Sequence, residues 1–538
     1  MDLENNDTFV KPTLSAPQDA KDAFDLAGMG HEQAMTRKFS LWSMLAMAFC
    51  VLSSWAAISA TFQTGLDNGG PITILWGMIL ITAVNLCIAV SLGELCSSMP
   101  TALGQAYYVY KLYSCEVGRL LSYLCAWTNI FGWWTASASL VAFNTNFILG
   151  LKLIYDPEWE GVNEPWISFV VYLGFSLFVT VVNVVGCRKD QFLPWLNNLM
   201  GILLAALFLV FSLAFIIAVA TNDHLSFRPP SFVFATWINN TGWSDGVVWF
   251  LGLLQSAYGL TAFDSVIHMV EEMPDPRRNG PKAIYLAVLS GAVTGFFFMM
   301  ICLFCMQDID TIIDSPTGLP FIGLVQAIMG DNGAAALIAL YLVACIGQGV
   351  SVATTASRLT WGFARDGGFP WSSYLSKVDP VWKAPVRAIW VQGILTSLVG
   401  VLYLFSTTVL TAIVSVSTVA LMISYGIPIS TLLIVGRDKL CPGPFRLGKW
   451  GAPINYVSVA TCAITTVFFF FPASPSPDGS NMNYAIAVFG VMVVVSLGFW
   501  LARGHRTYMR TEEATQDIIL AHQLGAQISR ENSIEKKE

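Results

Sequence analysis

The sequence predicts an all-α polytopic membrane protein with twelve transmembrane helices, and its composition and its apolar runs lead to this prediction. Of the 538 residues, 55% are hydrophobic and only 12% are charged, about half the charged fraction of a soluble domain. A transmembrane helix needs ~20 apolar residues, and apolar runs of this length follow one another along most of the chain. The composition excludes most soluble folds as well as disordered and collagen-like chains.

Twelve apolar runs, each bounded by polar residues, glycine or proline, are expected to cross the membrane. They lie at about 41–64, 72–97, 120–150, 166–186, 193–220, 246–271, 282–307, 334–364, 386–405, 408–436, 453–472 and 482–502. The transporter-like domain 39–503 is flanked by a disordered N-terminal tail, 1–38, and a C-terminal tail, 504–538. No cleavable signal peptide precedes the first run, which is therefore expected to act as a retained anchor.

Positive charge predicts the orientation of the spans. With twelve spans and a cytoplasmic N-terminus, all but two of the 28 Lys and Arg residues fall on the inner side, the exceptions being Lys152 and Arg228. Inner loops of membrane proteins carry this excess of basic residues, so both termini are predicted to be cytoplasmic. No basic stripe or metal-ligand spacing is present in the sequence, so we expect no nucleic acid partner, metal or cofactor.

The eleven cysteines and the sequon of a predicted outer loop add little to this assignment. Cys302 and Cys305 form a CxxC pair inside an apolar run, where packing explains them better than redox chemistry. The predicted outer loops contain no cysteine, so no disulfide framework is expected. Asn239 begins an Asn-Asn-Thr sequon in the predicted outer loop between spans 5 and 6, which makes it a glycosylation candidate.

Two spans carry small and polar residues where an apolar helix is expected, at 53–61 in span 1 and at 255–264 in span 6. Unwound helices of transporters expose backbone groups that hold substrate and ions. Close helix packing also favours small residues, but the spacing of five spans is that of a five-plus-five inverted repeat and favours a binding site. The candidate substrate-binding residues are Trp55, Ala56, Ala57, Ile58, Ser59, Trp133, Tyr258, Gly259, Leu260, Thr261 and Phe263.

Few ionisable residues lie within the apolar runs, where each is costly. Asp264 and His268 stand four residues apart in span 6 and share one helical face. A carboxylate beside an imidazole can accept and pass a proton, so the pair is the candidate for coupling; an ordinary hydrogen-bonding His at a solvated helix end is the alternative. Glu94 and Arg358 are further candidates for coupling or gating, and Arg358 is equally well explained as a structural anchor.

Four stretches of the sequence resemble the amino acid–polyamine–organocation superfamily, and within it the fungal amino acid/choline permeases. Residues 54–59 and 68–71 are similar to the family's broken first helix and the loop after it, and residues 93–105 to the inner end of helix 2. Residues 264–281 are similar to the helix 6–7 signature, and residues 356–368 to the end of helix 8. The resemblance extends over nearly all of the predicted membrane region.

The resemblance implies a leucine-transporter-like fold, with inverted repeats at about 41–220 and 246–436 and two further helices at about 453–502. It implies alternating access at the plasma membrane and import of an amino acid or a small organic amine, such as choline or GABA, with a proton. A non-transporting nutrient sensor of the same fold and a sodium-coupled or exchange transporter are the alternatives. The sequence shows no paired catalytic carboxylates in a loop and no nucleophile elbow, so we expect no enzyme activity.

The chain departs from this family in two places. Many relatives carry glycine in the first break, whereas this chain has no glycine between Cys50 and Gly65. A break without glycine exposes backbone N–H groups less readily. This weighs against binding of a substrate carboxylate by these groups and is compatible with amine substrates. Span 5 lacks the lysine that replaces sodium in some proton-coupled relatives, and the hydroxyls of Thr354 and Thr355 on span 8 form a candidate ion site.

Overall fold

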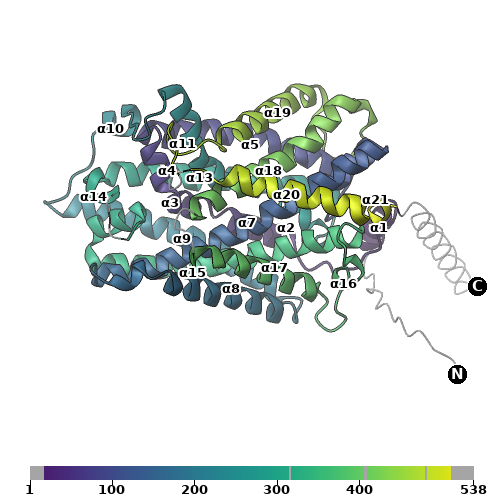
Figure 1. Ribbon diagram of the computed structural model, residues 1–538, viewed down its shortest axis with the longest axis horizontal. Helices are drawn as coiled ribbons and strands as arrows, with labels where there is room; N and C mark the ends of the chain where they lie inside the picture. The colour runs from purple at the N-terminus through teal and green to yellow at the C-terminus, as the bar shows by residue number, and fades with distance from the viewer. Residues whose placement is uncertain (1–16, 314, 316, 405–408, 479–481, 511–538) are drawn as a thin grey trace, which may run out of the picture.

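The computed structural model describes residues 17–313, 315, 317–404, 409–478 and 482–510. Over these residues the fold is a bundle of α-helices, most of which run in one common direction (Figure 1). Twelve stretches of the described chain are long and apolar enough to cross a membrane. The predicted all-α fold with twelve transmembrane helices is therefore confirmed.

The spans are built from the following elements. Span 1 consists of α2 (Leu41–Leu52) and α3 (Ser54–Ala60), and span 6 consists of α11 (Asp245–Leu260) and α12 (Ser265–His268). Span 9 is α17 (Val386–Gly400) with the 3-10 turn η3 (Val401–Leu404), and span 12 is α20 (Ala485–Phe499) with the π-turn η6 (Trp500–Gly504) and α21 (His505–Thr507). The others are α5 (Gly70–Ser98), α7 (Glu116–Tyr155), α8 (Pro165–Gly186), α9 (Phe192–Thr221), α13 (Pro276–Cys305), α15 (Pro320–Arg365), α18 (Val409–Val435) and α19 (Gly451–Phe468). Shorter elements are α1 (Pro17–Ala27), α4 (Phe62–Asp67), α6 (Gln105–Leu112), α10 (Pro230–Ala235), α14 (Ile309–Ile313), α16 (Ser372–Leu375), η1 (Glu160–Asn163), η2 (Val270–Glu272), η4 (Arg437–Lys439) and η5 (Gly448–Trp450).

Two helices are longer than the apolar runs that predict them. The run at 120–150 lies within α7, which has 40 residues and a length of about 60 Å at the helical rise, twice the ~30 Å of a hydrocarbon layer. The run at 334–364 lies within α15, which begins at Pro320 and bends at Gly330, where φ is 66°. The extensions of α7 include charged residues such as Glu116 and Arg119, whereas the extension of α15 at 320–329 is largely apolar and is separated from the run by the Gly-Asp-Asn-Gly stretch 330–333.

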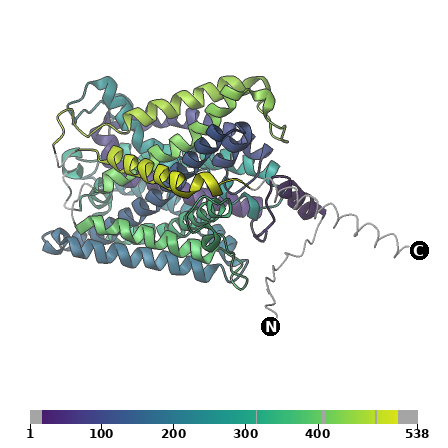
Figure 2. The same ribbon diagram turned by 45° about the vertical axis from the view of Figure 1, so that its right-hand side comes forward.

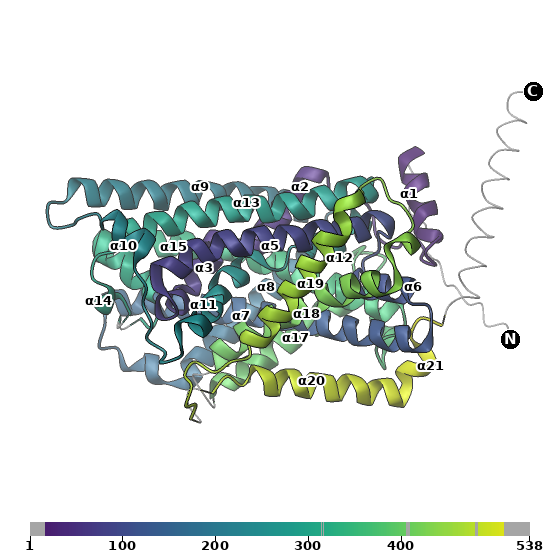
Figure 3. The same ribbon diagram turned by 90° about the horizontal axis from the view of Figure 1, so that it is seen from above.

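The described ends of the chain lie at one end of the bundle. Helices α1 and α21 lie at this end, and α10 and α14 lie at the opposite one (Figure 3); we call these the tail end and the far end. Figure 2 shows the purple helix α1 beside the tail end. The segment 17–38, part of the predicted polar tail, is folded against the bundle, and its buried apolar residues are Ala23, Leu26, Ala27 and Met35.

Span 1 breaks at Ser53, which has φ 40° and lies in the left-handed region. Residues 54–60 form the helix α3, so the interruption predicted at 53–61 is confined to its two ends, Ser53 and Thr61. The Ser53 hydroxyl donates a hydrogen bond to the carbonyl oxygen of Cys50, which supports the turn locally. A serine therefore makes the break that glycine makes in many relatives.

Span 6 breaks between Leu260 and Ser265, inside the interruption predicted at 255–264. Ala262 lies at the centre of the break with φ 70°, a conformation that costs a residue with a Cβ about 1–2 kcal/mol. Its backbone N–H donates to the hydroxyl of Tyr425 at 3.2 Å. The surrounding structure therefore holds a strained residue in place, as is common at functional sites.

Replacing Ala262 with glycine should raise the free energy of unfolding by about 1 kcal/mol, because glycine adopts positive φ without the Cβ penalty. Thermal unfolding of the detergent-solubilised protein measures the change. The control is Ala257→Gly in the regular helix α11, which should lower stability by about 1 kcal/mol. Equal destabilisation by both substitutions would contradict the strain at Ala262.

Candidate functional site

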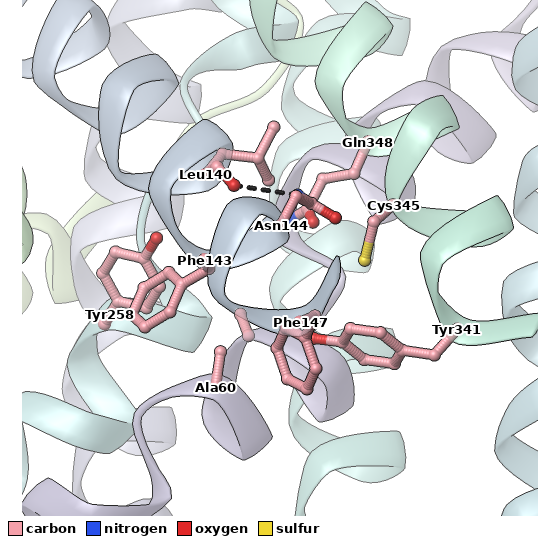
Figure 4. A pocket seen from close by; sticks show the side chains of 10 residues that line it. Ala60, Leu140, Phe143, Asn144, Phe147, Tyr258, Tyr341, Cys345 and Gln348 are labelled. Carbon is pink, nitrogen blue, oxygen red and sulfur yellow. Dashed lines mark hydrogen bonds between the residues drawn. The ribbon is translucent and has the colours of Figure 1, made fainter. Parts of the chain in front are cut away.

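A small cavity, with room for about one water molecule, lies between α3, α7, α11 and α15, in the interior of the bundle (Figure 4). Its walls are mainly aromatic and aliphatic, with two amide side chains among them, a composition typical of small-molecule sites. The lining residues are Ala57, Ala60, Leu140, Phe143, Asn144, Phe147, Tyr258, Tyr341, Cys345 and Gln348. The cavity therefore contains groups that can pack on a small ligand and orient it.

The cavity wall is bonded to span 1 on both sides of its break. The Tyr341 hydroxyl donates to the carbonyl oxygen of Ala56 at 3.1 Å, and Gln348 Nε2 donates to the carbonyl oxygen of Val51 at 3.3 Å. Both donors belong to α15, and their acceptors flank Ser53. A ligand that displaces either side chain therefore acts on the broken segment of span 1.

Aromatic rings face one another across the cavity. Phe143 and Tyr258 meet edge to face with ring centroids 5.9 Å apart, and Phe147 lies 4.6 Å from Tyr341. Asn144, on the same helix as the two phenylalanines, donates its amide N–H to a carbonyl of its own helix, and Figure 4 shows it beside Gln348. Rings of this kind can hold a cationic amine.

The structure distributes the predicted substrate-binding residues over four places. Ala57 and Tyr258 line the cavity. Trp55 lies instead in an aromatic cluster, with its ring centroid 4.9 Å from that of Phe298 and 5.5 Å from that of Phe211. Six others are buried in the packing around the breaks, namely Ala56, Ile58, Ser59, Gly259, Leu260 and Thr261. Trp133 and Phe263 lie next to a polar network around Asp264.

Asp264 is fully buried, and donors from four elements surround its carboxylate. The Tyr425 hydroxyl of α18 donates to Oδ1 at 2.6 Å. The other oxygen, Oδ2, lies near Gln105 Nε2 (2.9 Å), His268 Nε2 (3.0 Å), Trp133 Nε1 (3.2 Å) and Asn129 Nδ2 (3.4 Å). A buried carboxylate needs such partners because burial without them is very costly. The network joins α12 to α6, α7 and α18.

The partners of His268 define where protons lie. Its Nδ1 is 2.8 Å from the carbonyl oxygen of Ala102, which can only accept, so Nδ1 carries a proton. The contact between Nε2 and Asp264 Oδ2 needs a second proton on one of the two atoms. Tyr425 accepts from Ala262 and therefore donates to Asp264. In this conformation the pair of His268 and Asp264 therefore shares one proton.

Three buried acid–base pairs follow between this network and the tail end. Arg358 Nε lies 2.9 Å from Glu272 Oε1. Arg365 binds Glu271 through two hydrogen bonds of 2.9 and 3.0 Å. His31 Nε2 lies 2.7 Å from Asp366 Oδ1, at the end of α15. Two of these pairs join η2 to α15, and the third joins the N-terminal segment to the residue after that helix.

The two carboxyl groups at the tail end are held ionised. Burial raises the pKa of Glu271, but the charge and hydrogen bonds of Arg365 outweigh burial and bring it below its ordinary value. Burial likewise raises the pKa of Asp366, and His31 and Arg365 together bring it below its ordinary value. These carboxylates therefore remain charged well below neutral pH.

The remaining predicted site residues lie apart from this network. Glu94 forms two hydrogen bonds of 2.8 and 2.7 Å with Arg437. The Thr354 hydroxyl accepts from Asn183 Nδ2 at 2.7 Å, and Thr355 donates to a carbonyl of its own helix. Asn239 is exposed in the loop between α10 and α11. The ion site, the roles of Glu94 and Arg358 and the glycosylation of Asn239 stay predictions.

Several residues of the site were not identified from the sequence. Asn129 and Asn144 are polar residues inside the apolar part of span 3, and this was a usable signal. Gln105 belongs to the motif at 93–105, but nothing in that motif indicates that its partner is Asp264. Tyr425 and Gln348 carry no local signal, because only the fold brings them to the site.

Comparison with known proteins agrees with this architecture. Residues 39–494 match the family described as Amino acid permease. A Macrophomina phaseolina protein named as an amino acid/polyamine transporter is 33% identical over 450 residues, covering 82% of this chain and 97% of the relative. The choline transporter of Saccharomyces cerevisiae is 31% identical over 523 residues, covering 96% and 91%. The Arabidopsis thaliana amino-acid permease BAT1 is 27% identical over 518 residues, covering 93% and 97%.

The chain belongs to the amino acid permease family. This assignment confirms the family resemblance found in the sequence. Together with the twelve apolar helices it makes the chain an integral membrane protein. Since the family and these relatives are permeases and transporters, the prediction that the chain is not an enzyme is also confirmed.

Replacing Glu271 with glutamine should lower the free energy of unfolding by about 3 kcal/mol at pH 7, because it leaves Arg365 buried without its counter-charge. A carboxyl whose pKa is lowered by folding stabilises the protein above its unfolded pKa of about 4.3, and this stability is lost as pH falls through the folded pKa. The difference between wild type and variant, measured by denaturation in detergent, should therefore shrink below about pH 4.

The matched control for this prediction is Glu116→Gln. Glu116 pairs with Arg119 but is 75% exposed, so its loss should change stability by less than about 1 kcal/mol. A pH-independent difference between wild type and Glu271→Gln would contradict the ionised state of Glu271.

Proposed function

We propose that this chain, a member of the amino acid permease family, is a secondary transporter of the plasma membrane that imports an amino acid or a small organic amine with a proton. The observation that carries the proposal is the buried 3.0 Å contact between Asp264 Oδ2 and His268 Nε2 on the tail side of the small cavity. The tail end faces the cytoplasm, and both termini lie there.

The cavity favours an amine-bearing substrate. Its aromatic residues offer ring faces to an ammonium group, and the amides of Asn144 and Gln348 can hydrogen-bond a hydroxyl, an amine or a carboxylate. The lining consists of apolar and neutral polar residues, so a substrate would be held by its dipoles and its cation–ring contacts. The yeast choline transporter and the amino acid/polyamine transporter among the relatives support the same substrate class.

The proton would be taken up and released through rearrangement of the network. The proton between His268 Nε2 and Asp264 Oδ2 is held by both atoms, while Ala102 accepts the proton on Nδ1. Opening of the tail end would separate α12 from Ala102 and from its partners on α7 and α18. An imidazole in water is largely neutral at pH 7, so the shared proton would then leave to the cytoplasm. Alternating access ties this release to release of the substrate.

Positive charge supports the orientation. Basic residues such as Arg277, Arg437 and Arg503 lie on the side of the tail end, whereas at the far end Lys152 lies in the last turn of α7 and Arg228 in the connection between α9 and α10. Cytoplasmic loops carry the excess of Lys and Arg. A sodium-coupled mechanism is the alternative: Thr354 already accepts a hydrogen bond from Asn183, whereas Thr355 donates to its own helix and keeps its lone pairs for a cation.

Uptake of labelled choline, GABA and amino acids into cells expressing the chain, at outer pH 5.5 and 7.5, tests the proposal. We expect at least one compound to accumulate above the vector control and faster at pH 5.5. Asp264→Asn and His268→Gln should abolish the pH dependence, because neither can share the proton. Met269→Leu, a neutral change next to His268, is the control and should retain it. Binding without accumulation would instead indicate a sensor.

Phe143→Leu should raise the KM for the transported amine about tenfold with little change in maximal rate, because it removes one aromatic face from the cavity. Concentration-dependent uptake measures both parameters. Phe297→Leu is the matched control, since Phe297 is 47% exposed on the outside of the bundle. Equal KM values in both variants would contradict the assignment of the substrate site to this cavity.

A further inference from the structure

The N-terminal segment 22–39 lies across the tail end and is bonded to parts of the bundle that are far apart in sequence. His31, which is 6% exposed, pairs through Nε2 with Asp366 at the end of α15, at 2.7 Å. The Tyr107 hydroxyl of α6 donates to the backbone carbonyl of Met29 at 3.0 Å. One short segment therefore holds both α15 and α6.

The same segment also holds η2 through its backbone. Gln33 Nε2 donates to the carbonyl oxygen of Glu271 at 3.0 Å. The backbone N–H groups of Lys38 and Phe39 both donate to the carbonyl oxygen of Glu272, at 3.0 Å each. These are the two glutamates whose side chains bind Arg365 and Arg358 on α15. The segment therefore forms a second layer of bonds over the joint between η2 and α15.

This joint lies between the cavity and the tail end. Along α15, Gln348 lines the cavity, Arg358 follows after ten residues and Arg365 after seven more, which is about 26 Å of helix in all. Both arginines are bonded to η2. The N-terminal segment is bonded both to η2 and to Asp366, the residue that follows α15.

We propose that residues 22–39 form an autoinhibitory clamp on the inner gate, with the pair of His31 and Asp366 as its latch. The clamp holds η2 against α15, and its release lets the two part. The proposal rests on the proposed function in one respect, namely that opening of the tail end is a step of transport. The clamp itself is a property of the folded chain and can be tested without substrate.

The contacts suit a releasable element. Four of them are single hydrogen bonds to backbone carbonyls, and two others are long ion pairs, of Asp25 with Arg277 at 3.5 Å and of Lys38 with Asp190 at 3.8 Å. Elements held by few bonds open at a lower free energy than the core. The latch is the strongest single contact, because it joins two ionisable side chains that are both nearly buried.

The last described residues of the chain reach the same turn. The backbone N–H of Met509 donates to the carbonyl oxygen of Asp366 at 3.1 Å, and the Thr507 hydroxyl donates to that of Gly367 at 2.9 Å. Asp366 thus holds the N-terminal segment with its side chain and the C-terminal segment with its backbone. A change in either cytoplasmic segment therefore acts on the turn that ends α15.

Thiol labelling of the full-length chain tests the clamp. Cys187 is buried beside Arg358, with Sγ 3.9 Å from Nη2, so it reports opening of this joint. A membrane-impermeant maleimide is added to the cytoplasmic face of inside-out vesicles, and mass spectrometry measures labelling at each cysteine. Cys441 is exposed and serves as the reference, and Cys302, buried in α13, reports general unfolding.

In His31→Ala, labelling of Cys187 relative to Cys441 should rise about tenfold, which corresponds to loss of one charge-assisted hydrogen bond. Gln33→Ala should show a smaller rise. Glu32→Ala, a change at the exposed neighbour, should leave it unchanged. Unchanged labelling of Cys187 in His31→Ala would overturn the clamp. An equal rise at Cys302 would also overturn it, because the segment would then be a general stabiliser.

The same variants separate the clamp from the proposed function. A rise at Cys187 with a higher maximal uptake rate supports both. A rise at Cys187 in a chain that accumulates none of the tested compounds supports the clamp and contradicts the transporter. Substrate uptake with pH dependence and no change at Cys187 supports the transporter and contradicts the clamp.

Discussion

The rest of the site depends on one constraint, which is that the buried carboxylate of Asp264 must be fully paired. A charge in the interior of an apolar bundle is tolerated only with hydrogen-bond partners on every side. These come from α6, α7 and α18 as well as from His268 on its own helix. Four elements therefore meet around Asp264 at the break of span 6. With all of these partners in place, its carboxylate is fully paired.

The breaks and the cavity are linked but are not in the same place. Ser53 and Ala262 adopt left-handed conformations, whereas the cavity begins about one turn away, at Ala57 and Tyr258. The amide of Ala262 is bonded to Tyr425, which donates to Asp264. The unwound backbone of span 6 is therefore connected to the proton-bearing pair, and a ligand at the neighbouring cavity acts on this backbone through α11.

The sequence predicted the features that leave a local pattern. Apolar runs located the twelve spans, small and polar residues located both breaks, and the spacing of four placed Asp264 and His268 on one face. Features that depend on partners distant in the chain were not predictable, such as the contact of Tyr425 with Asp264. Trp55 lies in a stretch whose composition predicts a binding site, but in the fold its ring packs against other aromatic rings. Similarly, polarity at 17–38 gave no sign that His31 has a buried partner at Asp366.

The charged residues of span 6 and η2 form one short segment, and this has a mechanical consequence. Asp264 and His268 bind α6, α7 and α18, while Glu271 and Glu272, three and four residues further on, bind α15. In the proposed transport cycle this short segment moves as a unit, which couples loss of the shared proton to separation of the ion pairs. Since buried ion pairs resist the loss of a single partner, the gate should open only when several of these contacts release together. The N-terminal segment is hydrogen-bonded to the backbone carbonyls of the same η2 residues. In the proposed mechanism its bonds must break in the same step as the ion pairs, so they raise the free energy of that step.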